Sequence, residues 1–236
     1  MDYLSIPASP QLLEGQLWGE RFHLFMQQQE MGLPMSAVMA QDSDLQACVD
    51  ALQLTGTTLF GSGELFRHSE YEQAFTLNGY RFTVIYDLLR VWNNRSEIVD
   101  WKTYLKPRKQ AELKRNWQTR LYLYALVEST DLAPEQVEMT YWFVRTRNQI
   151  NQVLEPQHVQ IAYSQDRHEQ THQDLLRITE QLTDWLGRSQ PFPQVPETME
   201  RCGSCPFVSR CRRNQDSREV ERVFLPDLGR IKEVTL

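Results

Sequence analysis

The chain has 236 residues, of which 41% are hydrophobic and 24% are charged. This length fits one well-cored domain with appendages, and the composition is that of a folded globular protein and not of a disordered one. No apolar run approaches the roughly 20 residues that span a bilayer, and no basic and apolar leader precedes the first charges, so we expect a cytoplasmic protein without a membrane partner. The net charge of -6 argues against a protein that coats nucleic acid indiscriminately.

Charge is distributed unevenly along the chain. Residues 1–100 carry 13 acidic and 5 basic side chains. Between Trp101 and Arg120 a basic strip follows, with Glu112 as its one acidic residue. The basic residues of this strip are Lys102, Lys106, Arg108, Lys109, Lys114, Arg115 and Arg120. Such a strip suits the handling of phosphate, although a helix that displays a solvated basic face accounts for the strip alone equally well.

The first half of the chain is expected to hold two helices and then three strands. Apolar residues at three- and four-residue spacing predict an amphipathic helix over residues 11–29 and another over residues 42–54, which Gly56 would end. The Asn78-Gly79 pair between two β-rich runs is the strongest short signal for a hairpin. The strands of a three-stranded antiparallel meander are expected over residues 72–77, 80–92 and 97–103.

The second half is expected to open with one continuous helix from Pro107 to Val127. Alternating residues then predict strands over residues 136–145 and 158–163, and a long helix is expected over residues 166–186. The buried stripe of this last helix would comprise Leu175, Leu176, Ile178, Leu182 and Trp185. These elements predict an α/β fold with a mixed central sheet flanked by helices. We divide the chain into a core domain over residues 1–195 and a C-terminal cysteine-containing segment over residues 196–236, packed on the core.

Two aspartates and a lysine lie on the apolar strands of the meander. Asp87 is embedded in the run VIYDLL, and Asp100 and Lys102 share one face of their strand. Pairing across the turn can bring them beside Asp87, although the sequence does not fix this register. Two carboxylates and the carbonyl of Trp101 are oxygen ligands that Mg²⁺ or Mn²⁺ prefers, and His23 could complete the set. Lys102 could orient or deprotonate a water that attacks a phosphodiester.

A simpler interpretation of these residues is structural. Asp87 and Asp100 could be strand-edge residues, one of them paired with Lys102, and a lone histidine on a helix is more often a surface or core residue than a ligand. Burial argues against this interpretation, because an unpaired carboxylate within an apolar strand is costly. On the residues alone, the two interpretations stay equally open.

The order of these residues along the chain is distinctive. It runs His23, Asp87, Asp100-Trp101-Lys102 and Gln118-x-x-x-Tyr122, with the tetrapeptide DWKT and the run QTRLYLYAL. This order resembles the PD-(D/E)XK nuclease superfamily, in particular its RecB-like branch and the CRISPR-associated RecB-like exonucleases. The resemblance implies a restriction-endonuclease-like core. It also implies metal-dependent hydrolysis of DNA, exonuclease-type, acting on single strands or ends in repair, recombination or defence.

The resemblance also implies roles for individual residues. His23, Asp87 and Asp100 would bind the metal, together with the Trp101 carbonyl. Asp87 and Asp100 would also belong to the catalytic set with Lys102, while Gln118 and Tyr122 would support the site and the substrate strand. In the superfamily a glycine often stands three residues before the second-motif aspartate. Val84 stands there in this chain, a mild substitution that should not abolish the chemistry, which leaves 5′-phosphate and 3′-hydroxyl ends.

Three of the four cysteines form a cluster, Cys202-x2-Cys205-x5-Cys211, which in a cytosolic protein points to metal and not to disulfides. The cluster resembles the C-terminal triplet that holds a [4Fe-4S] cluster in RecB-like and AddB-like nucleases, in which a fourth cysteine precedes the histidine motif. Here Cys48 follows His23, and no cysteine precedes it. We favour a missing N-terminal segment over Cys48 as the fourth ligand, and Zn²⁺ or no metal at all remains an alternative.

Two functions therefore compete. The first is a divalent-metal-dependent deoxyribonuclease. The alternative is a catalytically inactive nuclease-like subunit that binds DNA or a partner and carries a structural metal or Fe-S site. The intact Asp87, Asp100 and Lys102 favour the first. A purely structural zinc protein would leave the ordered motif unexplained.

Overall fold

The computed structural model describes residues 10–56, 59–61, 63–105, 107–196, 202 and 205. Residues Pro10–Pro191 form one compact unit that contains the described helices and strands, and the described residues from Phe192 onward belong to a second unit. The boundary between residues 195 and 196, and the packing of the cysteine segment on the core, stay predictions. Among the described helices, none is both long and apolar enough to cross a membrane.

Five strands form one mixed sheet in the order β1-β2-β3-β4-β5. The strands are β1 (Phe66–Leu77), β2 (Tyr80–Val91), β3 (Ser96–Lys102), β4 (Val137–Phe143) and β5 (Gln157–Ala162). The first three form the predicted antiparallel meander, β4 runs parallel to β3, and β5 runs antiparallel to β4. Asn78 and Gly79 both have positive φ, as a two-residue hairpin turn requires. The predicted α/β fold class is confirmed.

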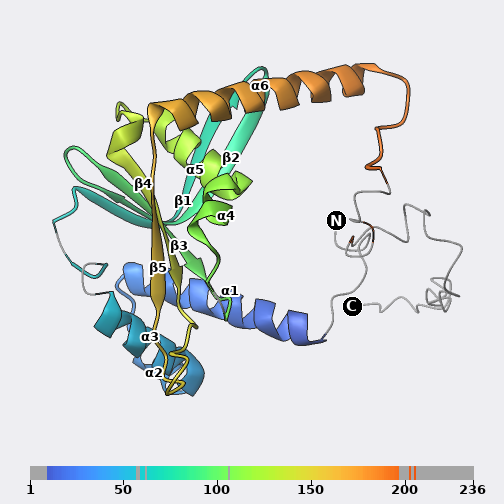
Figure 1. Cartoon of the computed structure of the whole chain (residues 1–236). Helices are drawn as coiled ribbons and strands as arrows, with labels where there is room; N and C mark the ends of the chain where they lie inside the picture. The colour runs from blue at the N-terminus through green and yellow to red at the C-terminus, as the bar shows by residue number, and fades with distance from the viewer. Residues whose placement is uncertain are drawn as a thin grey trace, which may run out of the picture. The chain divides into compact units, whose positions relative to one another are not determined.

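Helices cover both faces of the sheet (Figure 1). They are α1 (Pro10–Glu30), α2 (Ser36–Met39), α3 (Ser43–Thr55), α4 (Gln110–Arg115), α5 (Trp117–Glu128) and α6 (Gln165–Gly187). Side chains from α1 and α3 form one apolar core with β2, β3 and β4, and side chains from α4 and α5 form another with the same strands and β5. α6 lies on α5. The sheet therefore separates two hydrophobic cores, and both helical layers reach β2 and β3.

The prediction of a single helix from Pro107 to Val127 is wrong, because the helix is interrupted at Asn116, between α4 and α5. Asn116 has an extended backbone, with φ -65° and ψ 137°, and its side chain accepts a hydrogen bond from the Gln118 N–H at 3.0 Å. Asparagine is a favoured N-cap because its oxygen satisfies an N–H that lacks a helical partner. The new helix therefore starts at Trp117 and carries Gln118 in its first turn.

The predicted apolar stripe of α6 is correct only in part. Leu175 is buried, but Ile178 is 38% exposed, and the other buried residues of the helix are Thr171 and Thr179. Threonine can be buried at these positions because its hydroxyl donates a hydrogen bond to the carbonyl one turn earlier. The Thr179 hydroxyl also accepts a hydrogen bond from the Asn78 side chain at 3.0 Å. The hairpin tip is thus fastened to α6 by polar contacts.

An ion-pair network holds the end of α1 beside β1. The guanidinium of Arg67 donates two hydrogen bonds to the Glu30 carboxylate, at 2.6 and 2.7 Å, and a third to Glu64 at 3.1 Å. Glu64 also accepts from the buried Arg90. Two-pronged pairs of this kind fix orientation as well as distance. The network therefore sets the position of the helix that carries His23.

Phe22 is expected to be a main anchor of α1. Its side chain is 0% exposed and lies between Trp18, at 5.6 Å between ring centroids, and Trp101, at 6.2 Å. Replacing Phe22 with alanine should lower the free energy of unfolding by about 3 to 5 kcal/mol, because a buried ring is lost and a cavity remains. Leu24 on the same helix is 52% exposed, so Leu24→Ala is the matched control. Urea unfolding would test this, and equal midpoints for the two variants would contradict the packing described.

Candidate active site

Three acidic residues lie in one row across the sheet, on β1, β2 and β3. Ser69 pairs with Leu88 and Tyr71 with Tyr86, so Glu70 lies opposite Asp87.

On the other side of β2, the pairing with β3 ends at Leu88 and Val99, and the next positions are Asp87 and Asp100. In place of a further strand pair, Asp87 Oδ2 accepts a hydrogen bond from the Trp101 N–H at 2.7 Å. The row therefore sits where β2 and β3 separate.

Side-chain alternation along β2 shifts at Asp87. Val84, Tyr86 and Leu89 belong to the core beside α5, whereas Leu88 belongs to the core beside α1. A regular strand would send Tyr86 and Leu89 to opposite faces. Alternation from Tyr86 already points Asp87 toward His23 on α1, and the irregularity keeps Leu88 on that same face.

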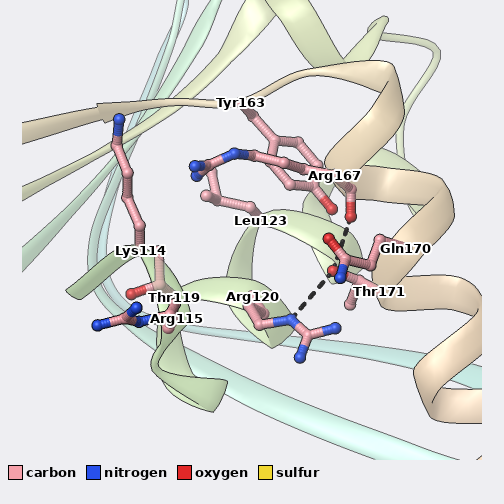
Figure 2. A pocket seen from close by; sticks show the side chains of 9 residues that line it. All are labelled: Lys114, Arg115, Thr119, Arg120, Leu123, Tyr163, Arg167, Gln170 and Thr171. Carbon is pink, nitrogen blue, oxygen red and sulfur yellow. Dashed lines mark hydrogen bonds between the residues drawn. The ribbon is translucent and has the colours of Figure 1, made fainter. Parts of the chain in front are cut away.

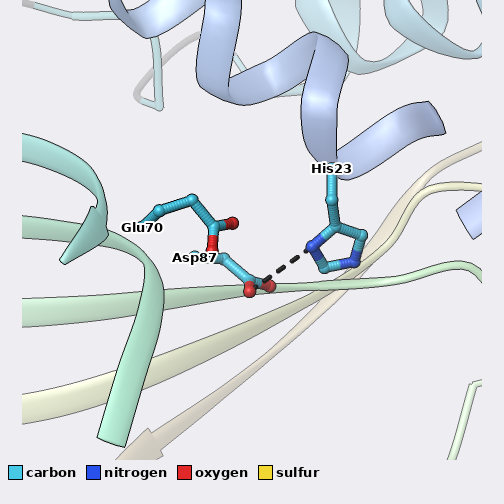
Figure 3. A group of neighbouring side chains, drawn as sticks. All are labelled: His23, Glu70 and Asp87. Carbon is cyan, nitrogen blue, oxygen red and sulfur yellow. Dashed lines mark ion pairs between the residues drawn. The ribbon is translucent and has the colours of Figure 1, made fainter. Parts of the chain in front are cut away.

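The first cluster of candidate ligands comprises His23 on α1, Glu70 on β1 and Asp87 on β2 (Figure 3). One ligand atom from each lies within 4.8 Å of the other two, and His23 Nδ1 is 3.4 Å from Asp87 Oδ1. Burial and the charge of Asp87 raise the pKa of Glu70. Burial would lower the pKa of His23, but the hydrogen bond with Asp87 and the surrounding carboxylates outweigh it and raise that pKa. The cluster thus concentrates negative charge around one histidine.

The second cluster comprises Asp100, Lys102 and Gln118. Lys102 Nζ lies 2.7 Å from Asp100 Oδ2 and donates a hydrogen bond to Gln118 Oε1 at 3.0 Å, while Gln118 Nε2 donates to Asp100 Oδ1 at 2.6 Å. Burial and the charge of Asp87 raise the pKa of Asp100, although Lys102 opposes this shift. The three side chains form a closed ring that fixes the position of the lysine. Asp100 and Lys102 share one face of β3, and the first turn of α5 brings Gln118 to both.

Aromatic side chains support the second cluster. Lys102 Nζ lies 5.3 Å from the ring centroid of Tyr141, whose hydroxyl is 2.7 Å from that of Thr119. Tyr122 lies one turn beyond Gln118 on α5, and its ring packs edge-on against Tyr86 at 5.3 Å. Burial raises the pKa of Tyr122, so its hydroxyl is neutral at ordinary pH. Of the two predicted α5 residues, Gln118 therefore bonds Asp100 directly, whereas Tyr122 packs against Tyr86 one turn further along the helix.

The donor set fits a divalent cation. Asp100 Oδ2 is buried and, among the described residues, accepts no hydrogen bond of normal geometry, having only the ion pair with Lys102. Carboxylates that stay buried without full compensation are costly and are typical of functional sites. The two carboxylates and the imidazole of the first cluster are ligands that Mg²⁺, and still more Mn²⁺, accepts, and Asp100 is not among the residues whose ligand atoms lie within 4.8 Å of one another.

A groove of about 650 Å³ opens onto the first cluster. It is lined by Gly15, Gln16, Gly19, Glu20, His23, Glu70, Asp87, Thr103 and Tyr104. A Cβ on Gly19 would lie 3.1 Å from Thr103 Oγ1, so this glycine lets α1 approach the end of β3 closely. Tyr104 is exposed at the rim, with the Arg108 guanidinium 5.0 Å from its ring centroid. The groove therefore makes His23, Glu70 and Asp87 accessible from solvent.

Glu70 is the site residue that sequence reasoning missed, because β1 begins at Phe66 and not at residue 72 as predicted. The sequence nevertheless contains a signal that predicts the position of Glu70. A two-residue turn fixes the hairpin register, and Glu70 precedes Asn78 by the same interval at which Asp87 follows Gly79. Opposition of Glu70 and Asp87 therefore follows from the turn alone.

The backbone of Glu70 gives a test of its role. Its φ of 49° lies in the left-handed region, which costs a side-chain-bearing residue about 1 kcal/mol or more relative to glycine. The free energy of unfolding of Glu70→Gly should therefore exceed that of Glu70→Ala by about 1 kcal/mol. In a urea titration, Glu70→Gly should unfold at the higher urea concentration. Both variants lose the carboxylate, so the difference between them reports on the backbone alone. Equal stabilities would show that the strained backbone is not retained in solution.

The cysteines are described only in part. Cys202 and Cys205 are free and partly exposed, the Cys205 N–H donates to the Cys202 carbonyl at 3.3 Å, and Cys211 lies outside the described residues. Cys48 is buried in the apolar core between α1, α3 and the sheet. The [4Fe-4S] and Zn²⁺ assignments therefore stay predictions.

Comparison with known protein families finds a match over most of the chain. The profile of the PD-(D/E)XK nuclease superfamily matches residues 53–212, which is more than half of the chain. No curated protein matches its sequence.

Two solved structures are similar at low identity. The crystal structure of SSO0001 is 17% identical with a TM-score of 0.37, and the alignment covers 74% of this chain and 73% of that one. The crystal structure of a proposed exonuclease from Eubacterium rectale is 14% identical with a TM-score of 0.35, covering 65% of this chain and 64% of that one.

Proposed function

Because the chain belongs to the PD-(D/E)XK nuclease superfamily, we propose that it is a divalent-metal-dependent deoxyribonuclease of the RecB-like branch. Nucleases of this superfamily act on nucleic acid and generally use divalent metal ions. We further propose exonuclease-type action on DNA ends or single strands, in repair, recombination or defence. The observation that supports this most strongly is the position of Lys102, held between Asp100 and Gln118 beside the His23, Glu70 and Asp87 cluster.

When bound, a divalent cation supplies charge that stabilises the phosphate in the transition state and makes water a better nucleophile near neutral pH. We assign its ligands to His23, Glu70, Asp87 and Asp100, with the Trp101 carbonyl. Glu70 extends the set expected from the sequence. Asp87 is already oriented by the Trp101 N–H, so its second oxygen is left to face His23.

We assign to the Lys102 ammonium the task of orienting the attacking water and offsetting negative charge on the phosphate; deprotonation of that water would instead require the neutral amine. Its ammonium is fixed by Asp100 and Gln118, which leaves little rotational freedom to lose in the transition state. Gln118 acts as a positioning residue, since it bonds both partners. Tyr122, one turn along α5, is assigned to the substrate strand.

The test is cleavage of end-labelled single- and double-stranded DNA with Mn²⁺, Mg²⁺ or EDTA. We expect shortening products in the presence of metal, with single strands or ends preferred, and none in EDTA. Asp100→Asn is the matched inactive variant. Cleavage that persists in EDTA would contradict metal dependence, and internal cuts in circular DNA would contradict exonuclease-type action.

The alternative is an inactive nuclease-like subunit that binds DNA or a partner. The complete set of Asp87, Asp100 and Lys102, held in bonded geometry, argues against it. DNA binding by folded protein without cleavage in either metal would support this alternative.

A further inference from the structure

A second concave site lies on another face of α5 from Gln118 and Tyr122. It is a pocket of about 300 Å³ between α4, α5, the end of β5 and α6 (Figure 2). Thr119 and Leu123 of α5 form part of its wall, together with Tyr163 and Thr171. This volume is at the lower end of pockets that hold small ligands. None of its lining residues belongs to the carboxylate clusters.

The lining of this pocket is strongly basic. Lys114, Arg115, Arg120 and Arg167 contribute four cations, and among the described residues no acidic side chain lines the pocket. Arg120 pairs with Asp174 at 2.6 Å, but within the described part of the chain no carboxylate pairs with Lys114, Arg115 or Arg167. In Figure 2 the Arg167 side chain extends from α6 across the pocket toward α4. Gathered like charges repel one another, so an anion in the pocket would relieve this repulsion.

The floor of the pocket is uncharged and already hydrogen-bonded. Thr119 Oγ1 donates to the Leu113 carbonyl at 2.6 Å, and Thr171 Oγ1 donates to the Arg167 carbonyl at 2.8 Å. The guanidinium of Arg167 has no described hydrogen bond of its own. The cations at the rim are therefore the groups left to bind a ligand, and their chemistry suits an anion such as phosphate.

The pocket is connected structurally to the lysine of the active site. Thr119 on its wall bonds the Tyr141 hydroxyl, and the Tyr141 ring carries Lys102 on its face. Trp117 on α5 is 41% exposed; the Arg120 guanidinium lies over one face of its ring, 4.2 Å from the centroid, and the other face is left for a nucleobase. Exposed aromatic and unpaired basic side chains on one helix pair are typical of surfaces that follow a nucleic-acid strand.

We propose that this pocket binds a backbone phosphate of the nucleic-acid strand, away from the phosphate that is hydrolysed. This inference rests on the proposed function for the nature of the ligand, but not on cleavage. Arg167 and Lys114 hold the phosphate from opposite helices, and Arg115 adds long-range attraction.

The test is binding of a fluorescently labelled oligothymidylate to the full chain in EDTA, measured by anisotropy over a range of salt concentrations. Arg167→Ala should weaken binding about tenfold, the worth of one charge-assisted hydrogen bond. The slope of log affinity against log salt should fall by about 0.7, since one phosphate contact with a single strand is lost. Arg167→Lys should recover part of the affinity.

The matched control is Arg81→Ala, which removes the same charge from an exposed site on β2. It should leave the affinity and the salt slope close to those of the wild type. Equal binding by Arg167→Ala and wild type, with both folded by circular dichroism, would overturn the proposal. A pocket for free anions only would also overturn it, and would appear as stabilisation of the wild type by inorganic phosphate, lost in Arg167→Ala, with unchanged oligonucleotide binding.

Failure of this inference and failure of the proposed function give different results. Binding in EDTA requires neither metal nor catalysis. A protein that never cleaves DNA but loses affinity in Arg167→Ala would keep the phosphate pocket and refute the nuclease activity. Metal-dependent cleavage by the wild type, with unchanged DNA binding in Arg167→Ala, would support the nuclease activity and refute the phosphate pocket.

Discussion

Replacing Lys102 with alanine is expected to lower the rate of metal-dependent DNA cleavage by about 10²- to 10⁴-fold, the usual contribution of a positioned acid or base. The ammonium lies 2.7 Å from Asp100 Oδ2 and 3.0 Å from Gln118 Oε1, so its position is defined by an ion pair and a hydrogen bond. Alanine removes both the charge and the donor. Single-turnover cleavage of end-labelled DNA at saturating Mn²⁺ measures this effect on the chemical step.

A matched control for this prediction lies in the same basic strip. Lys109 is exposed at the start of α4, and its side chain makes no capping hydrogen bond. Lys109→Ala should therefore cleave nearly as fast as the wild type, which separates a general loss of positive charge from loss of the lysine at the site. Lys102→Met is a second variant that keeps the apolar stem over Tyr141, so it should fold even if alanine does not. Full activity in a folded Lys102→Met protein would refute the assigned role.

The hairpin explains why so much of the fold could be predicted from the sequence. Asn78-Gly79 requires positive φ at both positions, and this requirement fixes the turn, the register of β1 with β2, and the opposition of Glu70 and Asp87. Strand periodicity then places Asp100 and Lys102 on one face, as the 2.7 Å ion pair shows. Local rules determine these features, so no long-range information is needed to predict them.

Other features depend on contacts that a single sequence does not reveal. The break at Asn116 looks like one residue within a helical run, yet its side chain caps the next helix at Gln118. Leu113 before the break and Leu123 after it are both buried in the core beside the sheet. The left-handed backbone of Glu70 similarly arises where the strand must turn its carboxylate toward Asp87 and His23. Tertiary packing determines both the interruption at Asn116 and the backbone of Glu70. Periodicity does not contain this information, so it predicted one continuous helix and a strand shorter than β1.

Asp100→Asn is expected to reduce metal-dependent cleavage by about 10³-fold, because charge stabilisation by a bound cation is worth several kcal/mol and each 1.4 kcal/mol is tenfold in rate. Asparagine keeps the size of the side chain and can still accept from Gln118 Nε2, so the closed ring with Lys102 loses charge more than shape. Without metal, the variant should be about as stable as the wild type, since burial and the Asp87 charge oppose ionisation of Asp100. Stabilisation by added Mn²⁺ should be largely lost.

Glu97 on the same strand should behave in the opposite way and so separates function from stability. Its carboxylate accepts from Arg90 at 3.0 Å and from the Thr140 hydroxyl at 2.6 Å. Glu97→Gln should therefore lower the free energy of unfolding by about 1.5 to 3 kcal/mol, the usual worth of charged hydrogen bonds, while folded protein cleaves normally. Thermal melts with and without Mn²⁺ measure both variants. If Asp100→Asn instead behaved like Glu97→Gln, with lost stability and intact cleavage, Asp100 would be a structural residue, and the buried carboxylate without a full set of hydrogen bonds would need an explanation other than a bound cation.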